Sequence, residues 1–294
     1  MIPAAFDYTR AATLDEALDL IAGADPSIRV LAGGQSLIPL MKLRLARPER
    51  LIDVGRLPEL VGICDLDGGG LAIGALTTWA TLLEDARIQH FGALADAIPV
   101  IGDIQVRNLG TIGGSLAHAD PASDIAAPVL ALEVELIARS AARGERSIAT
   151  NEFFAGPFAT VLEPDEMLIE IRLPASAPIT ASAYRALPQP ASGYPIAGVA
   201  VVLTAAPGRT ADSDGARFSA CQVAVTGVGD QPYRAVEIEQ AILAGIPLAK
   251  ALRSITDGQR IASDIHADRE YRAAMAVVMA RRAADAAIAR LTRG

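Results

Sequence analysis

Apolar positions near the start of the chain predict a small α/β lobe. A capping-box pattern begins at Thr13, and apolar residues then recur at helical spacing up to Gly23, which is predicted to stop the helix. The predicted buried face of this helix consists of Leu14, Ala17, Leu18 and Ile21. Apolar runs at 28–32 and 51–54 predict two short strands, the first of them buried. Residues 1–55 therefore form the first predicted part of the fold.

The middle of the chain alternates between strand and helix patterns. Glycines at 68–70 predict a hairpin turn, and the Thr77-Thr78 pair supplies an N-cap for the helix that follows. Periodicity predicts further elements, which are helices at 91–98 and 124–131 and strands at 132–136 and 167–173. This region, residues 56–177, is the second predicted part.

Prolines at 174, 178, 188 and 190 mark a change of character, so a domain boundary is expected near residue 177. Beyond it, strands are predicted at 196–205 and 219–227, separated by the polar loop PGRTADSDG. Helices are predicted at 234–244 and 247–256, and a last helix from Asp268 with an apolar face of Tyr271, Met275, Val278 and Met279. The third part, 178–294, is thus an antiparallel sheet with a helical cluster, and the whole chain is α+β.

Composition narrows the possible functions. The chain has 294 residues and a net charge of −8, and its basic residues are dispersed, so nucleic acid is not an expected partner. No apolar run reaches the roughly 18 residues that span a bilayer, and no export signal is visible. Cys64 and Cys221 are far apart, and the three histidines have no ligand spacing. We expect a cytoplasmic protein with no metal site of its own.

Two glycine turns carry the candidate chemistry. One runs Ala32-Gly33-Gly34-Gln35-Ser36-Leu37, and the other runs from Thr111 to Ser115 through Gly113 and Gly114, before Asp120-Pro121 and Asp124. Glycine lets a ligand approach the main chain closely, and successive N–H groups in such a turn form an anion site. We therefore predict that main-chain N–H groups of both turns, helped by nearby hydroxyls, hold a phosphate. Plain structural turns remain the alternative from the residues alone.

Known phosphate-binding motifs do not account for these turns. Neither matches a P-loop, and neither is a dinucleotide-binding G-x-G-x-x-G followed by an acidic residue at the expected distance.

Two segments resemble the FAD-binding medium subunit of molybdenum hydroxylases, the carbon monoxide dehydrogenase and xanthine dehydrogenase group. They are AGGQSLIPLMKLRLARPERLIDV at 32–54 and RNLGTIGGSLAHADPASD at 107–124. The resemblance extends over the whole chain. It implies a two-lobed FAD-binding unit of the vanillyl-alcohol-oxidase (PCMH) type, with FAD between residues 1–55 and 56–177.

The resemblance also implies which residues contact FAD. It assigns both glycine turns to the cofactor, with Asp124, Leu168, Ile101 and Tyr194 near its other parts. Structural alternatives stay open for three of them: Asp124 as a helix N-cap, Leu168 as a core strand residue and Tyr194 as a linker anchor. No residue is assigned a catalytic role. Many relatives carry a lysine where this chain has Arg185-Ala186, and arginine is not its equivalent.

The function implied by the resemblance is electron transfer within a complex. A large partner subunit would hold the molybdenum cofactor and a small one iron–sulfur clusters, and FAD would pass electrons to an external acceptor, in a dimer of heterotrimers. Two alternatives are a stand-alone FAD oxidoreductase and a non-catalytic nucleotide-binding assembly subunit. The substrate and the acceptor are not expected to be readable from this chain.

Overall fold

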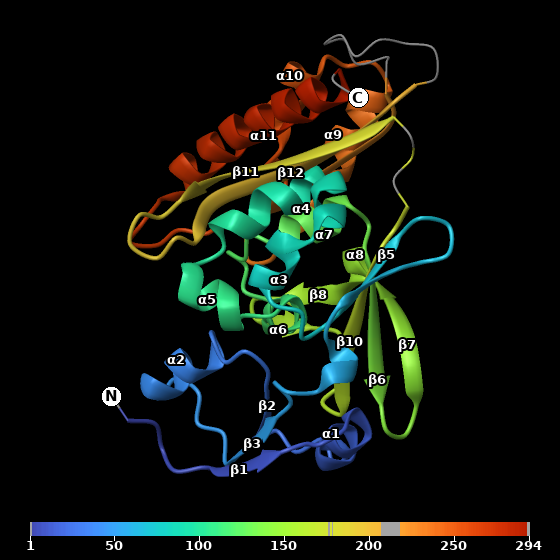
Figure 1. Ribbon diagram of the computed structural model, residues 1–294. Helices are drawn as coiled ribbons and strands as arrows, with labels where there is room; N and C mark the ends of the chain where they lie inside the picture. Colours follow the sequence, from blue (N-terminus) through green and yellow to red (C-terminus); the bar gives the residue numbers. More distant parts are fainter. Residues whose placement is uncertain (1, 176, 178, 207–217, 293–294) are drawn as a thin grey trace.

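The computed structural model describes residues 2–175, 177, 179–206 and 218–292. The predicted polar loop after residue 206 lies outside them. Within the described residues the chain forms three successive layers, with the N-terminal lobe at one end and the C-terminal helix at the other (Figure 1). The α+β class is confirmed. No helix in the described parts of the chain is long and apolar enough to cross a membrane.

The N-terminal lobe is built on a parallel three-stranded sheet of order β1-β3-β2. Its elements are β1 (Asp7–Arg10), α1 (Leu14–Ile21), β2 (Ile28–Leu31), α2 (Leu37–Lys42) and β3 (Arg50–Asp53). The four apolar residues predicted to share one face of α1 are all buried. Strand β1 was not predicted, because its sequence DYTR has no apolar alternation, and three of its four residues are exposed.

Details of this lobe differ from the predictions. Thr13 caps α1 as expected, but the Glu16 carboxylate accepts from the N–H of Ala12 rather than from that of the cap residue. The left-handed residue after the helix is Ala24, with φ +51°, and not Gly23. Strand β2 is half-buried and not fully buried, because one side of it faces the cavity described below.

The second part contains a five-stranded antiparallel sheet of order β4-β5-β10-β6-β7. Its strands are β4 (Ile63–Asp65), β5 (Leu71–Gly74), β6 (Glu135–Ser140), β7 (Gly144–Ala149) and β10 (Glu166–Leu173). The predicted hairpin and Thr78 cap are confirmed. The predicted strand at 132–136 begins only at Glu135, because the chain turns there with Glu133 at φ +53°.

Short elements cover this sheet and connect it to the other layers. They are α3 (Trp79–Glu84), α4 (Gly92–Ala97), α5 (Ile104–Leu109), α6 (Ile112–His118), α7 (Ala126–Ala131), α8 (Thr150–Phe153), the 3-10 turns η1 (Pro58–Leu60), η2 (Ala86–His90) and η3 (Ile98–Val100), and the small hairpin of β8 (Phe154–Gly156) and β9 (Ala159–Thr160). The core beneath them includes Trp79, which is almost fully buried.

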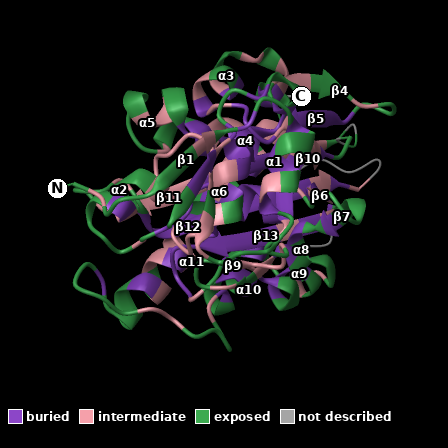
Figure 2. Ribbon diagram, turned by 90° about the horizontal axis from the view of Figure 1, so that it is seen from below, coloured by how far each residue is buried: buried purple, intermediate pink, exposed green. Residues whose placement is uncertain are grey.

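The third part is an antiparallel sheet of order β11-β12-β13-β14. Its elements are β11 (Thr180–Pro188), β12 (Pro195–Ala205), β13 (Phe218–Thr226), β14 (Tyr233–Arg234), α9 (Val236–Leu243), α10 (Leu248–Ala251), η5 (Leu252–Ser254) and α11 (Arg269–Leu291). Helix α11 covers one face of the sheet, and α4 and α7 of the second part pack on the other (Figure 1). Strands β12 and β13 are therefore buried on both faces (Figure 2).

The predicted apolar face of α11 is confirmed in part, since Met279 is buried and Met275 and Val278 pack against the core, but it was wrong for Tyr271. Tyr271 is exposed, Met275 and Val278 are half-buried, and the face against the sheet is made chiefly of alanines. It consists of Arg272, Ala276, Met279, Ala280, Ala283, Ala284 and Ala287. Small side chains let the helix axis lie close to the sheet, so alanine buries more completely here than a larger residue would.

Candidate functional site

A cavity of about 750 Å³ opens between the N-terminal lobe and the second part. Its walls come from β2, α2, α6 and β10, together with the turn between β11 and β12. All fourteen residues predicted to contact a cofactor line this one cavity. They are Ala32, Gly33, Gly34, Gln35, Ser36, Leu37, Ile101, Thr111, Gly113, Gly114, Ser115, Asp124, Leu168 and Tyr194.

The first glycine turn connects β2 to α2 and presents unpaired donors. Within the described residues, the main-chain N–H groups of the five residues from Gly33 to Leu37 have no hydrogen-bond acceptor. Gly34 has φ +73°, which glycine adopts without strain. Ser36 occupies the N-cap of α2, and its hydroxyl makes no capping bond. Five free N–H groups lining a cavity suit an anion, because buried donors without a partner are costly.

The second glycine turn has a different architecture. It is the first turn of α6, capped by Thr111, whose hydroxyl accepts from the N–H of Gly114 at 3.1 Å. The N–H groups of Ile112 and Gly113 are already bonded to the carbonyls of Thr77 and Ala75, at 3.1 and 2.9 Å.

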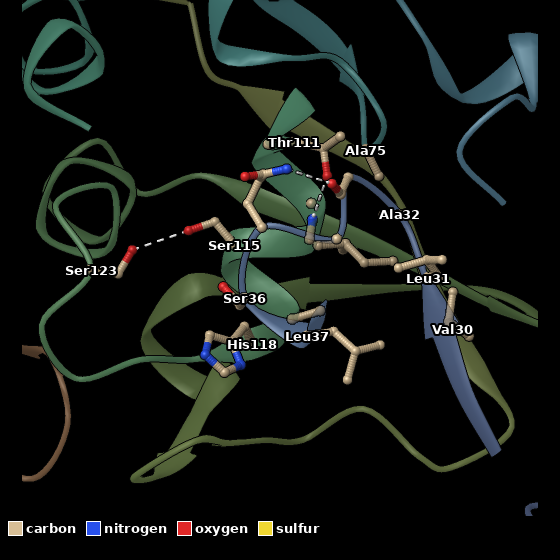
Figure 3. A pocket seen from close by; sticks show the side chains of 18 of the residues that line it. Val30, Leu31, Ala32, Ser36, Leu37, Ala75, Thr111, Ser115, His118 and Ser123 are labelled. Carbon is tan, nitrogen blue, oxygen red and sulfur yellow. Dashed lines mark hydrogen bonds between the residues drawn. The ribbon is translucent and has the colours of Figure 1, made fainter. Parts of the chain in front are cut away.

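The N–H groups of Ile112, Gly113 and Gly114 are therefore already paired within the protein, whereas phosphate binding at this turn stays a prediction. Helix α6 also lines the cavity with side chains, among them those of Ser115 and His118. Ser115 faces Ser123 across 3.2 Å between their hydroxyl oxygens (Figure 3).

Each turn contains a glycine that lies against another part of the chain. A Cβ added to Gly33 would lie 1.9 Å from the carbonyl oxygen of Leu109, and one added to Gly113 would lie 2.5 Å from the Cβ of Ala75. The first of these glycines therefore lets the N-terminal lobe meet the second part, and the second lets α6 pack on the end of β5. Both positions require glycine for close approach as well as for any ligand.

Asp124 is a buried carboxyl at the cavity wall, and its side chain does not cap a helix. The N-cap of α7 is Ile125, which has no side-chain capping bond, so the capping alternative was wrong. Instead the Asp124 carboxylate accepts a hydrogen bond of 2.7 Å from the hydroxyl of Tyr184 on β11. Burial raises the pKa of Asp124 to about 7, although the Tyr184 bond lowers it.

The apolar walls come from separate elements. Leu168 on β10 is almost fully buried, and the ladder to β6 shifts register immediately after it. Leu168 is therefore a core strand residue that also lines the cavity, and its contact with the cofactor stays a prediction. Ile101 follows η3 and is half-buried. Tyr194 lies in the turn before β12 and is 47% exposed at the edge of the cavity.

Arg185 does not take the place of the lysine found in relatives. Its guanidinium donates to the Asp96 carboxylate at 2.7 Å and to the carbonyl of Tyr184. It is not among the residues that line the cavity. The cavity therefore has no cation from this strand.

The structure adds residues that the sequence did not single out as cofactor contacts. His118 and Phe158 line the cavity with ring centroids 5.2 Å apart, and burial lowers the pKa of His118. Ser123 also lines it. Only Ser123 carried a usable signal, since it immediately precedes Asp124 in the second motif.

The comparisons with known proteins identify the class of protein to which this fold and cavity belong. Residues 4–176 match the family "FAD binding domain in molybdopterin dehydrogenase", and residues 182–287 match "CO dehydrogenase flavoprotein C-terminal domain". The chain belongs to the FAD-binding medium subunits of the molybdenum hydroxylases, and it is an oxidoreductase subunit.

Similar proteins match nearly end to end. The carbon monoxide dehydrogenase medium chain of Hydrogenophaga pseudoflava is 36% identical over 295 residues, covering 99% of each chain. The glyceraldehyde dehydrogenase medium chain of Sulfolobus acidocaldarius is 37% identical over 244 residues, or 83% of each.

Among solved structures, carbon monoxide dehydrogenase from Hydrogenophaga pseudoflava superposes with a TM-score of 0.90 at 38% identity, covering 99% of each chain. Quinoline 2-oxidoreductase from Pseudomonas putida 86 superposes with a TM-score of 0.88 at 29% identity, covering 99% of this chain and all of that one.

Proposed function

We propose that FAD lies in the cavity with its pyrophosphate on the loop from Gly33 to Leu37. The observation that carries this is the set of five unpaired main-chain N–H groups on residues that line one cavity. A diphosphate supplies the acceptors that these groups lack, and it needs no basic side chain. The other polar contacts come from the hydroxyls of Ser36, Thr111 and Ser115.

The remaining walls fit the apolar and aromatic end of the cofactor. Leu168 and Ile101 offer aliphatic surface, and Tyr194 at the cavity edge can cover one face of a ring system. Asp124 supplies a buried carboxyl on the cavity wall. When bound, FAD accepts electrons and passes them to an external acceptor, while the protein positions it and limits access of solvent.

We further propose that the chain works inside a complex. A large subunit with the molybdenum cofactor and a small subunit with iron–sulfur clusters would supply the electrons, in a dimer of heterotrimers located in the cytoplasm. The support is that relatives are named as medium chains of dehydrogenases and as the medium subunit of a hydroxylase. The three parts 1–55, 56–177 and 178–294 are proposed as domains on the basis that each has its own sheet.

A glycine substitution tests the position of the pyrophosphate. Gly34→Ala places a Cβ 2.7 Å from the side chain of Ile38 at a left-handed φ, so it distorts the loop that carries the free N–H groups. We expect the purified complex to lose most of its FAD, measured by absorbance after release. Gly68→Ala is the matched control, because that glycine also has positive φ but lies in a remote hairpin with open space around it.

Two outcomes would overturn the proposal. A native complex without FAD would refute FAD binding in this cavity altogether. Equal FAD content in Gly34→Ala, Gly68→Ala and the unaltered protein would refute the assignment of the pyrophosphate to this loop.

A further inference from the structure

The side chain of Tyr184 is buried between the C-terminal sheet and the cavity wall without lining the cavity itself. It is 2% exposed, and its hydroxyl donates to Oδ1 of Asp124 at 2.7 Å. Burial beside Asp124 raises the pKa of Tyr184 well above its usual value, so the hydroxyl stays protonated and remains the donor. No other side chain in the described part of the protein donates to this carboxyl.

The neighbouring strand is shaped around this hydroxyl. Gly198 lies in the middle of β12, paired with Ala186 on β11. A Cβ at Gly198 would lie 2.2 Å from the Tyr184 hydroxyl oxygen and 2.9 Å from its ring carbon Cζ. A glycine inside a buried strand weakens the strand, and it commonly marks a place where another group must come close. Here that group is the end of the Tyr184 side chain.

The segment that carries Asp124 is also fixed from the C-terminal part. The hydroxyl of Thr226, at the end of β13, lies 2.9 Å from the carbonyl oxygens of both Pro121 and Ser123. The N–H of Gly227 donates to the same Pro121 oxygen at 2.8 Å. The backbone on the N-terminal side of Asp124 is thus held by one strand, and its carboxyl is held by another.

We propose that Tyr184 is a positioning residue for the FAD site, whose hydroxyl holds the Asp124 carboxyl in its orientation at the cavity wall. The inference deepens the proposed function and rests on it, since Asp124 must face bound FAD. It assigns to the C-terminal part a role in the cofactor site beyond packing. A carboxyl held by a neutral donor keeps its charge more readily than the same buried carboxyl without one.

The consequence is measurable in the redox behaviour of the flavin. The titratable groups around Asp124 are Tyr184 from β11, Tyr194 from the following turn, and Asp120 and His118 from the end of α6 and the turn after it. Among these, Tyr184 alone makes a direct hydrogen bond to Asp124. Ionisation of Asp124 next to the flavin opposes electron uptake, so the midpoint potential against pH should show an inflection where this carboxyl titrates.

The test compares variants of the purified complex. Tyr184→Phe keeps the ring and removes the donor. We expect the inflection of the flavin midpoint potential to move to higher pH by about one unit, because the charged carboxylate loses a hydrogen bond. We also expect the dissociation constant of FAD to rise about 3- to 10-fold. Unchanged potentials and unchanged FAD affinity would overturn the inference.

Two controls separate positioning from stability. Tyr233→Phe removes the hydroxyl of a half-buried tyrosine of the same part, which donates to the carbonyl of Ile255 at 3.0 Å. It should lower the unfolding temperature and leave the flavin potential unchanged, and a shift equal to that of Tyr184→Phe would overturn the inference. Asp124→Asn should remove the inflection, and adding Tyr184→Phe to it should shift the potential no further.

A second variant tests the inference if Tyr184→Phe does not fold. Gly198→Ala displaces the hydroxyl by steric contact and should reproduce the shift to higher pH. Absence of FAD from the unaltered complex refutes the proposed function. Bound FAD whose potential responds to Asp124→Asn but to neither Tyr184→Phe nor Gly198→Ala refutes only the inference. If FAD is bound but its midpoint potential does not respond to Asp124→Asn, then Asp124 does not belong to the FAD site, and the inference is refuted as well.

Discussion

Arg290, close to the end of the chain, donates to both carboxylate oxygens of Asp96, a residue 194 positions earlier, at 2.9 and 2.7 Å. The same carboxylate accepts from Arg185 and from the main-chain N–H of Tyr184. One half-buried acid on α4 therefore joins the last helix, the first strand of the C-terminal sheet and the FAD-binding part. Bidentate arginine–carboxylate pairs of this kind are stronger than ordinary surface ion pairs.

Breaking this cluster should destabilise the whole chain. Arg290→Met keeps the aliphatic part of the side chain and leaves Asp96 with fewer donors, so we expect a loss of about 1–3 kcal/mol in the free energy of unfolding. Urea denaturation measures it. Arg260→Met is the control, since Arg260 is 87% exposed in its pair with Asp230, and it should cost less than about 0.5 kcal/mol. Equal losses of unfolding free energy in the two variants would show that the Asp96 cluster contributes no more to stability than an exposed ion pair does.

The contact between the first glycine turn and the end of α5 should tolerate no side chain at position 33. Gly33→Ala places a Cβ 1.9 Å from the carbonyl oxygen of Leu109, and neither backbone can move without opening the lobe interface. We expect a loss on the order of 1–3 kcal/mol in stability and reduced FAD content. Gly23→Ala, where no atom lies within 4 Å, is the control. A Gly33→Ala variant as stable as the unaltered protein would show that the close contact with the Leu109 carbonyl is not required for stability.

The buried carboxyl of Asp124 should make stability fall as pH rises. Its pKa is about 7 in the folded chain against 3.8 as the usual value, so the folded state keeps a proton that the unfolded state has already lost. Its contribution is therefore most favourable below the usual value and declines up to about pH 7. Asp124→Asn should remove this decline, gaining on the order of 1–4 kcal/mol near neutral pH relative to acid pH.

Unfolding of the FAD-free chain across this pH range, with and without the substitution, isolates the effect. Other carboxyls, such as Asp53 and Glu166, have pKa values lowered by their partners and act in the opposite direction. They cancel in the difference between the two proteins. A difference that does not change with pH would show that Asp124 titrates normally.

Thr226 should be required for cofactor affinity although it does not line the cavity. Thr226→Val keeps the shape and removes the hydroxyl shared by the carbonyls of Pro121 and Ser123. We expect about 1 kcal/mol less stability and weaker FAD binding, measured by fluorescence titration of the FAD-free protein. Thr180→Val, which breaks a threonine pair at the far end of the same sheet, should cost similar stability without affecting FAD. Matching FAD affinities would contradict the role of Thr226.

Periodicity and capping patterns predicted the helices and strands that depend mainly on residues within a single segment of the sequence. The α1 face, the Thr78 cap and the long strands β12 and β13 follow from periodicity and capping within one segment. Strand β1 escaped prediction because its pairing with β3 comes from residues more than forty positions away. The face of α11 was misjudged in part because close approach to a sheet selects small residues, whereas hydrophobicity favours large ones.

The sequence predicted residues that share one cavity but not all of their bonds. The resemblance led us to expect fourteen residues in the site, and all fourteen line one cavity, while their contact with FAD stays a prediction. It could not show that the N–H groups of α6 are consumed by Thr77 and Ala75, because that depends on how α6 packs against β5. The hydrogen bond between Tyr184 and Asp124 could not be predicted from the sequence either, because the two residues lie 60 positions apart. The one hint is Gly198 on the neighbouring strand, which leaves room for the Tyr184 hydroxyl.

The contact at Gly33 is made to the carbonyl of Leu109, and the Leu109 side chain itself is 57% exposed. The interface therefore depends on main-chain geometry at 109 and is indifferent to the identity of the side chain there. A substitution at position 109 should therefore disturb this contact far less than one at position 33. Because the Leu109 side chain does not make this contact, Leu109→Cys provides a site for a fluorophore that reports on the lobe contact without disturbing it. The exposed Cys64 would first be replaced, so that only the new cysteine is labelled.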